Sequence, residues 1–81
     1  MKLYKQGELG RSIMDVLREA GKPMGVHAVV SAMLLKGGYA EEARPALTPR
    51  VRGNLAYLHN AGKVAKNGRG MSVKWFLADG K

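Results

Sequence analysis

The sequence predicts an α+β domain of three helices followed by a C-terminal two-stranded hairpin, and three observations favour this class. Apolar residues recur at helical spacing in three separate segments. A glycine-rich turn then separates two short runs, which is the pattern of a hairpin. A length of 81 residues supports one hydrophobic core, so we expect a single domain over residues 1–81.

The first helix is expected over residues 8–20. Its apolar residues lie on one face, with charged residues between them; they are Leu9, Ile13, Val16, Leu17 and Ala20. Gly21 is a natural helix stop, and Pro23 turns the chain. Met24 and Gly25 follow, and this short segment can form a stub of strand.

The second helix is expected over residues 26–36. Its apolar stripe consists of Val26, Val29, Val30, Met33 and Leu34, and Gly37-Gly38 closes it. Leu35 points away from this stripe, so we expect the following segment to cover it. Residues 39–47 indicate a loop, with at most one helical turn at 41–44 that Pro45 ends.

The third helix is expected over residues 48–61. Thr48 suits the N-cap, and Pro49 suits the first helical position, where its missing N–H costs nothing. Apolar residues on one face predict the buried stripe; they are Val51, Leu55 and Leu58. The opposite face carries no acid and consists of Gly53, Ala56, Tyr57 and Asn60, flanked by Arg50 and Arg52.

The hairpin is expected over residues 63–77. Residues 64–66 form the first strand, the tetrapeptide NGRG at 67–70 forms the turn, and residues 71–77 form a longer second strand. Asn and Gly supply the positive φ angles that tight turns need. Alternation in the second strand places Val73, Trp75 and Leu77 on one face.

Charge is unevenly distributed along the chain. Fourteen Lys and Arg against six Asp and Glu give a net charge of +8. Residues 1–43 hold six basic and five acidic residues, a net charge of +1, whereas residues 44–81 hold eight basic residues and one acid, a net charge of +7. A polyanion such as a nucleic acid is the partner that this second half favours.

The order of helix, turn, helix, loop, helix and basic hairpin resembles the winged helix-turn-helix DNA-binding domain. The resemblance covers residues 8–78 and is most specific in LTPRVRGNLAYLHNAGKVAKNGRGMSVKWFLA, residues 47–78. It implies that the third helix lies in the major groove of double-stranded DNA, while the hairpin, or wing, contacts the backbone or minor groove. One departure is the connection of eleven residues, 37–47, where three or four are usual.

The resemblance places candidate DNA contacts on the third helix and the wing. Arg50 and Arg52 are candidates for guanine contact or phosphate clamping, and the wing lysines and Arg69 would anchor the hairpin. Glycines on both sides of Arg69 allow close approach to a phosphate, although the segment can also be only a turn. The full set is Thr48, Arg50, Arg52, Gly53, Tyr57, Asn60, Lys63, Lys66, Arg69 and Lys74.

We expect no catalytic residue, no metal site and no cofactor. The chain has no cysteine, and its two histidines, His27 and His59, lie far apart in sequence, whereas a metal site needs three or four ligands. No nucleophile–base pair suggests an enzyme. No apolar run approaches a signal peptide or the roughly 20 residues of a membrane span, so we expect a cytoplasmic, nucleoid-associated protein without a membrane partner.

Three functions stay open at this point. The first is a sequence-selective transcriptional regulator of the small bacterial or phage type. The second is a nonspecific architectural DNA binder, and the third is a winged-helix module that binds a protein through its third helix. RNA fits less well, because the hairpin lacks paired aromatic residues for stacking. No heptad pattern or additional helix is visible, so we expect a monomer or a weak homodimer.

Overall fold

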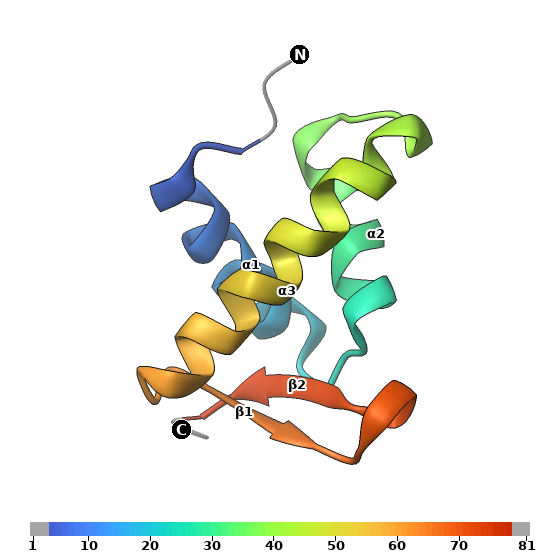
Figure 1. Cartoon of the computed structure of the whole chain (residues 1–81). Coiled ribbons are helices and arrows are strands. Elements are labelled where there is room, and N and C mark those ends of the chain that lie inside the picture. Colours follow the sequence, from blue (N-terminus) through green and yellow to red (C-terminus); the bar gives the residue numbers. More distant parts are fainter. Residues whose placement is uncertain (1–3, 79–81) are drawn as a thin grey trace.

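The helices and strands follow the predicted order. The computed structural model describes residues 4–78, so residues 1–3 and 79–81 of the predicted domain lie outside the described residues. Three helices precede an antiparallel hairpin, which confirms the α+β class and the winged-helix layout (Figure 1). The elements are α1 (Gln6–Ala20), α2 (Val26–Gly37), the 3₁₀ turn η1 (Glu41–Ala43), α3 (Arg44–Asn60), β1 (Val64–Asn67), the 3₁₀ turn η2 (Gly70–Ser72) and β2 (Lys74–Leu77).

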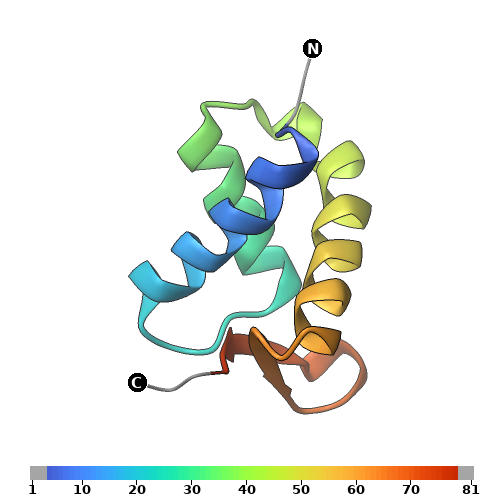
Figure 2. The ribbon, with the colours of Figure 1, turned by 90° about the vertical axis from the view of Figure 1, so that its left-hand side faces the viewer.

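The helices and the hairpin share one apolar core. The predicted stripes of the three helices turn inward, and they meet two residues of the hairpin. The main core residues are Leu9, Ile13, Val16, Leu17, Val29, Val30, Met33, Leu34, Leu47, Val51, Leu55, Leu58, Val64 and Trp75. Figure 2 shows the hairpin closing one end of the three-helix bundle. None of the described polar or charged residues is buried, so removal of apolar surface from water is the main stabilising contribution.

Helix α3 begins earlier than the sequence predicts. The expected N-cap at Thr48 is wrong, because α3 starts at Arg44 and Pro49 lies inside it. Pro45 does not end a helical turn; it lies in the first turn of α3, where its missing N–H removes no helical hydrogen bond. Burial of Leu47 anchors this additional turn to the core, and tertiary packing of this kind outweighs local propensity.

The connection between α2 and α3 is correspondingly short. It comprises six residues, 38–43, instead of the eleven expected from the sequence, which brings it closer to the length usual for a helix-turn-helix. Gly38 ends α2 in the left-handed conformation, with φ at 71°, and η1 leads directly into α3. The two helices therefore meet at a tight corner.

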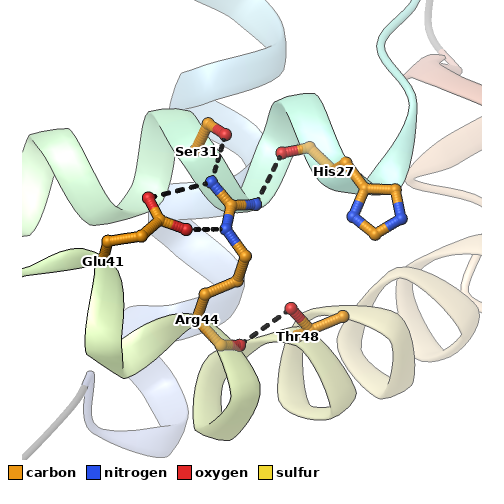
Figure 3. A network of polar contacts seen from close by, with 5 residues as sticks. All are labelled: His27, Ser31, Glu41, Arg44 and Thr48. Carbon is orange, nitrogen blue, oxygen red and sulfur yellow. Dashed lines mark hydrogen bonds and ion pairs between the residues drawn. The ribbon is translucent and has the colours of Figure 1, made fainter.

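Arg44 fastens this corner to α2 (Figure 3). Its guanidinium donates hydrogen bonds to Ser31 Oγ at 2.6 Å, to the His27 carbonyl at 3.4 Å and to the Glu41 carboxylate. The hydrogen bond from Arg44 lowers the pKa of Glu41 below its ordinary value, and the carboxylate in turn raises the pKa of Arg44. One side chain thus joins α2, η1 and the start of α3.

The hairpin has a first strand one residue longer, a shorter second strand and a longer tip than predicted. Strands β1 and β2 have four residues each, and their register runs from Val64 opposite Leu77 to Asn67 opposite Lys74. Residues 68–73 form the tip, so the predicted four-residue turn and the longer second strand are wrong. At Gly68, with φ at 94°, a Cβ atom would lie 2.7 Å from the Ser72 carbonyl oxygen, and the tip therefore requires glycine there.

Met24 fixes the hairpin to the helices. The expected strand stub forms, as an isolated antiparallel bridge between Met24 and Trp75. The Met24 N–H donates to the Trp75 carbonyl at 2.9 Å, and the Trp75 N–H donates to the Met24 carbonyl at 2.7 Å. Because Met24 connects α1 to α2, this pairing determines where the wing lies relative to the three helices.

Leu35 is not covered by the segment that follows it, contrary to expectation. Its side chain is 85% exposed, the largest exposed fraction among the described large apolar residues. The connection packs elsewhere on α2, where Arg44 holds it to Ser31. Leu35 therefore stands on an uncovered face of α2.

Candidate nucleic-acid interface

The outer face of α3 is open to solvent. The residues that the sequence placed opposite the buried stripe, Gly53, Ala56, Tyr57 and Asn60, are exposed, and so is the flanking Arg52. Tyr57 is 68% exposed, although it is a large aromatic residue. This face combines a guanidinium at one edge and a phenol at the other with small residues between them. A helix with so little bulk at its centre can approach a groove wall closely.

Two predicted contact residues are engaged inside the protein. The Arg50 guanidinium is half-buried and donates a hydrogen bond to the Tyr4 carbonyl, which ties the segment before α1 to α3. Thr48 is also half-buried, and its Oγ1 donates to the Arg44 carbonyl at 2.8 Å, within its own helix. The structure therefore brings Arg52, and not Arg50 or Thr48, to the solvent face of α3.

A hollow of about 520 Å³ lies between α3, the hairpin and the N-terminus of α2. Arg52 from α3 and two wing lysines, Lys66 and Lys74, line it together with His27 from the first turn of α2. The wing and the third helix thus present their cations around one concave surface. That arrangement suits an extended anion better than isolated surface charges do.

The N-terminus of α2 adds to the positive potential of this hollow. Its N-cap is Gly25, which offers no side-chain cap, and its first turn contains no acidic residue. The free N–H groups and the helix dipole therefore favour an anion at this point. The predicted site residues include neither His27 nor this helix N-terminus, although the absence of a capping side chain at Gly25 was an available signal.

Trp75 lines the same hollow from the hairpin. Lys66 Nζ lies 5.7 Å from the centre of the indole ring, close enough for a cation–π interaction. The indole Nε1 is buried and has no hydrogen-bond partner among the described residues. The indole ring of Trp75 therefore faces the Lys66 ammonium group, and its N–H has no acceptor among the described residues.

A second hollow, of about 660 Å³, lies on the other side of α3, against α1. Three of the predicted site residues line it, namely Gly53, Tyr57 and Lys63, together with Arg11 from α1. The predicted set is consequently divided: Arg52, Lys66 and Lys74 lie on the wing side of α3, and these three lie on the side facing α1. Asn60 is exposed in the last turn of α3.

Arg69 stands at the tip of the wing. Its backbone is extended, with φ at −137° and ψ at 152°, between Gly68 and Gly70, both of which have positive φ. It is exposed, and its guanidinium makes no hydrogen bond or ion pair with any other described residue, although its backbone carbonyl accepts a hydrogen bond from the Ser72 N–H at 3.0 Å. The side chain is thus free to contact an external group.

The carboxylates that form ion pairs lie away from these cations. The ion pairs join Asp15 to Arg18, Glu19 to Lys36 and Glu41 to Arg44. Within residues 4–78, five exposed cations that follow Arg50 have no carboxylate partner; they are Arg52, Lys63, Lys66, Arg69 and Lys74. Their charge is therefore uncompensated.

Metal ligands and membrane-spanning helices were also sought in the part of the chain that the structure describes. No three His, Asp or Glu side chains gather there as potential metal ligands. No helix in residues 4–78 has the length and apolar character needed to cross a bilayer. Comparisons with protein-family models, with curated proteins and with solved structures found no match.

Proposed function

We propose that this protein is a winged helix-turn-helix domain that binds double-stranded DNA and regulates transcription at selected sites. The observation that carries the proposal is a set of five cations, from α3 to the hairpin, that have no carboxylate partner within residues 4–78: Arg52, Lys63, Lys66, Arg69 and Lys74. A surface made only for solubility would mix both signs of charge. Phosphates supply the missing negative charge.

The geometry supports a definite orientation on DNA. In the proposed complex, the outer face of α3 enters the major groove, where Arg52 can reach guanine O6 and N7. Phosphates of one strand lie against the hollow beside the α2 N-terminus, near Lys66 and Lys74. Arg69 at the wing tip contacts the neighbouring backbone or minor groove.

The first experiment measures the affinity for duplex DNA as a function of salt concentration. Neutralisation of about five or six phosphates gives a slope of log affinity against log salt near −5. A slope near zero would contradict the electrostatic basis of the proposal. Selection of bound duplexes from a random pool then tests sequence preference, and a palindromic motif would indicate binding as a dimer.

One observation favours a second candidate, a nonspecific architectural DNA binder. The centre of the exposed α3 face carries only small residues, Gly53 and Ala56, and Arg52 is the single exposed guanidinium on that face. Few side chains are therefore available to read base edges. Both candidates imply a cytoplasmic protein associated with the nucleoid. Equal affinity for the selected duplex and a scrambled duplex at one salt concentration would favour the architectural role.

A further inference from the structure

A protruding leucine and an apolar hollow lie next to each other on the face formed by α1 and α2. Leu35 is 85% exposed, and the hollow beside it has a volume of about 400 Å³. The apolar lining comes from both helices and the segment between them: Val16, Ala20, Met24, Ala32 and Leu35. No residue of α3 or of the hairpin lines this hollow. The patch is thus separate from the candidate nucleic-acid interface.

This arrangement is complementary to itself. In a two-fold symmetric contact, the same patch meets its own copy, so each projection must face a depression on the same surface. Here Leu35 is the projection and the adjacent hollow is the depression. Single exposed leucines are ordinary in soluble proteins, but a leucine next to an apolar hollow forms a larger apolar patch, to which another protein surface can bind.

The charged residues at the edge of the patch are also compatible with a contact between two identical copies. Glu19 and Lys36 line the hollow and form an ion pair, with Nζ and Oε2 at 3.2 Å. A second copy would therefore bring one carboxylate and one ammonium group to the same edge. Neither sign dominates there, so two identical patches can approach without strong repulsion.

The charge of the whole chain favours the same face for contact between copies. Residues 44–81 carry a net charge of +7, which repels a second copy, whereas residues 1–43 carry a net charge of only +1. The hollow is lined solely by residues of this nearly neutral first half. Apolar exposure and low net charge thus coincide on this face.

We propose that the α1–α2 face is a homodimer interface in which Leu35 of each copy enters the hollow of the other. The proposal does not rest on DNA binding. The patch is small, so the dimer is weak, at the low end of specific interfaces, which bury less than about 1,200 Å². In such a dimer, α3 and the hairpin of each copy stay exposed, because they do not line the contact.

The test is sedimentation equilibrium of the full chain without DNA, at concentrations from roughly 10 µM to 1 mM, where a weak interface associates. We expect the apparent mass of the wild type to rise toward twice that of the monomer. Leu35→Glu should stay monomeric throughout, because a carboxylate would enter an apolar hollow. Leu35→Met should associate as the wild type does, since it keeps an apolar side chain of similar volume.

Tyr57→Glu is the matched control, because Tyr57 is the other exposed large apolar residue and lies on α3. It should associate as the wild type does. A wild type that stays monomeric over the whole range would overturn the proposal and leave the patch to a different partner. Association of Leu35→Glu equal to that of the wild type, or loss of association in Tyr57→Glu, would place the contact elsewhere. Circular dichroism checks that each variant is folded.

Discussion

Trp75 and Met24 exchange two backbone hydrogen bonds, of 2.9 and 2.7 Å, and this pairing holds the wing against the helices. The indole of Trp75 is buried beneath Lys66, and its ring centroid lies 6.1 Å from that of His59 in an edge-on arrangement. The same residue thus packs in the core, positions the hairpin and lines the hollow between the wing and α3. Loss of the indole should remove the core packing and reshape the hollow, whereas the two backbone hydrogen bonds do not depend on the side chain.

Trp75→Ala should lower the free energy of unfolding by about 3–5 kcal/mol, because it removes a large buried aromatic side chain. A small domain of this kind has a total stability of only about 5 kcal/mol, so much of the population would unfold. Urea denaturation followed by circular dichroism measures the effect. Lys74→Ala, a change at the exposed neighbouring position in β2, is the control and should leave the midpoint nearly unchanged. Equal midpoints for both variants would show that the hairpin is not docked as described.

Leu55→Ala should cost roughly 2–5 kcal/mol, since Leu55 is fully buried on the inner face of α3 and its truncation leaves a cavity. Tyr57→Ala, two residues further along the same helix, changes an exposed side chain and should cost much less. Thermal or urea unfolding of the two variants compares the two faces directly. The assigned orientation of α3 would be wrong if the Tyr57 variant proved the less stable.

Low pH should weaken the contact between Glu41 and Arg44, which links η1 to the start of α3. The pKa of Glu41 is lowered in the folded protein by the hydrogen bond from Arg44, so its contribution to stability is present above the ordinary pKa of 4.5. That contribution is lost as the pH falls through the lower folded pKa. Glu41→Gln should therefore reduce the loss of stability between neutral pH and about pH 3. The effect is small, because the pair is exposed to solvent.

Glu42→Gln is the control for this pH series, because Glu42 neighbours Glu41 and is exposed, but takes no part in the Arg44 network. Urea midpoints of the wild type and both variants at each pH give the comparison. Identical pH profiles for all three proteins would mean that the Glu41–Arg44 contact contributes nothing in solution.

The buried faces of all three helices could be predicted from the sequence, because their apolar residues form continuous stripes at helical spacing. The start of α3 could not. Pro45 and Pro49 are both compatible with a helix N-terminus, and the local pattern favours the Thr48-Pro49 pair. The choice between them depends on Leu47, because its side chain is buried in the core. Such a tertiary contact cannot be predicted from the residues next to it in the sequence.

The candidate site was predicted as a set of residues, but its arrangement was not. The meeting of Arg52 with Lys66, Lys74 and the α2 N-terminus depends on the pairing between Met24 and Trp75, which are far apart in sequence. Likewise, the hydrogen bond from Arg50 to the Tyr4 carbonyl joins two distant segments, so the sequence pattern did not distinguish Arg50 from Arg52.

This difference between the two arginines gives a prediction for DNA binding. Arg52→Ala should reduce the ratio of specific to nonspecific affinity, because a bidentate contact with guanine discriminates between bases by about 1–3 kcal/mol. Arg50→Ala should chiefly lower the unfolding midpoint, since its guanidinium is used inside the protein. Titration against a selected and a scrambled duplex, with unfolding curves for both variants, separates these effects. Loss of specificity in Arg50→Ala with unchanged specificity in Arg52→Ala would reverse the assignment.

Arg69→Ala tests whether the wing tip contacts DNA. Arg69 lies in a glycine-flanked tip, and its guanidinium has no partner among the described residues, so it suits a phosphate or a narrow minor groove better than precise base reading. A lost phosphate contact weakens binding about equally for every sequence and reduces the salt slope by about one. We therefore expect parallel losses on the selected and the scrambled duplex, measured at two salt concentrations. Unlike Gly68, Arg69 has a negative φ, so its replacement leaves the tip geometry intact and a change in affinity reports the contact itself. If Arg69→Ala binds both duplexes as tightly as the wild type, the tip is only a turn, and the DNA-contacting surface ends at Lys66 and Lys74.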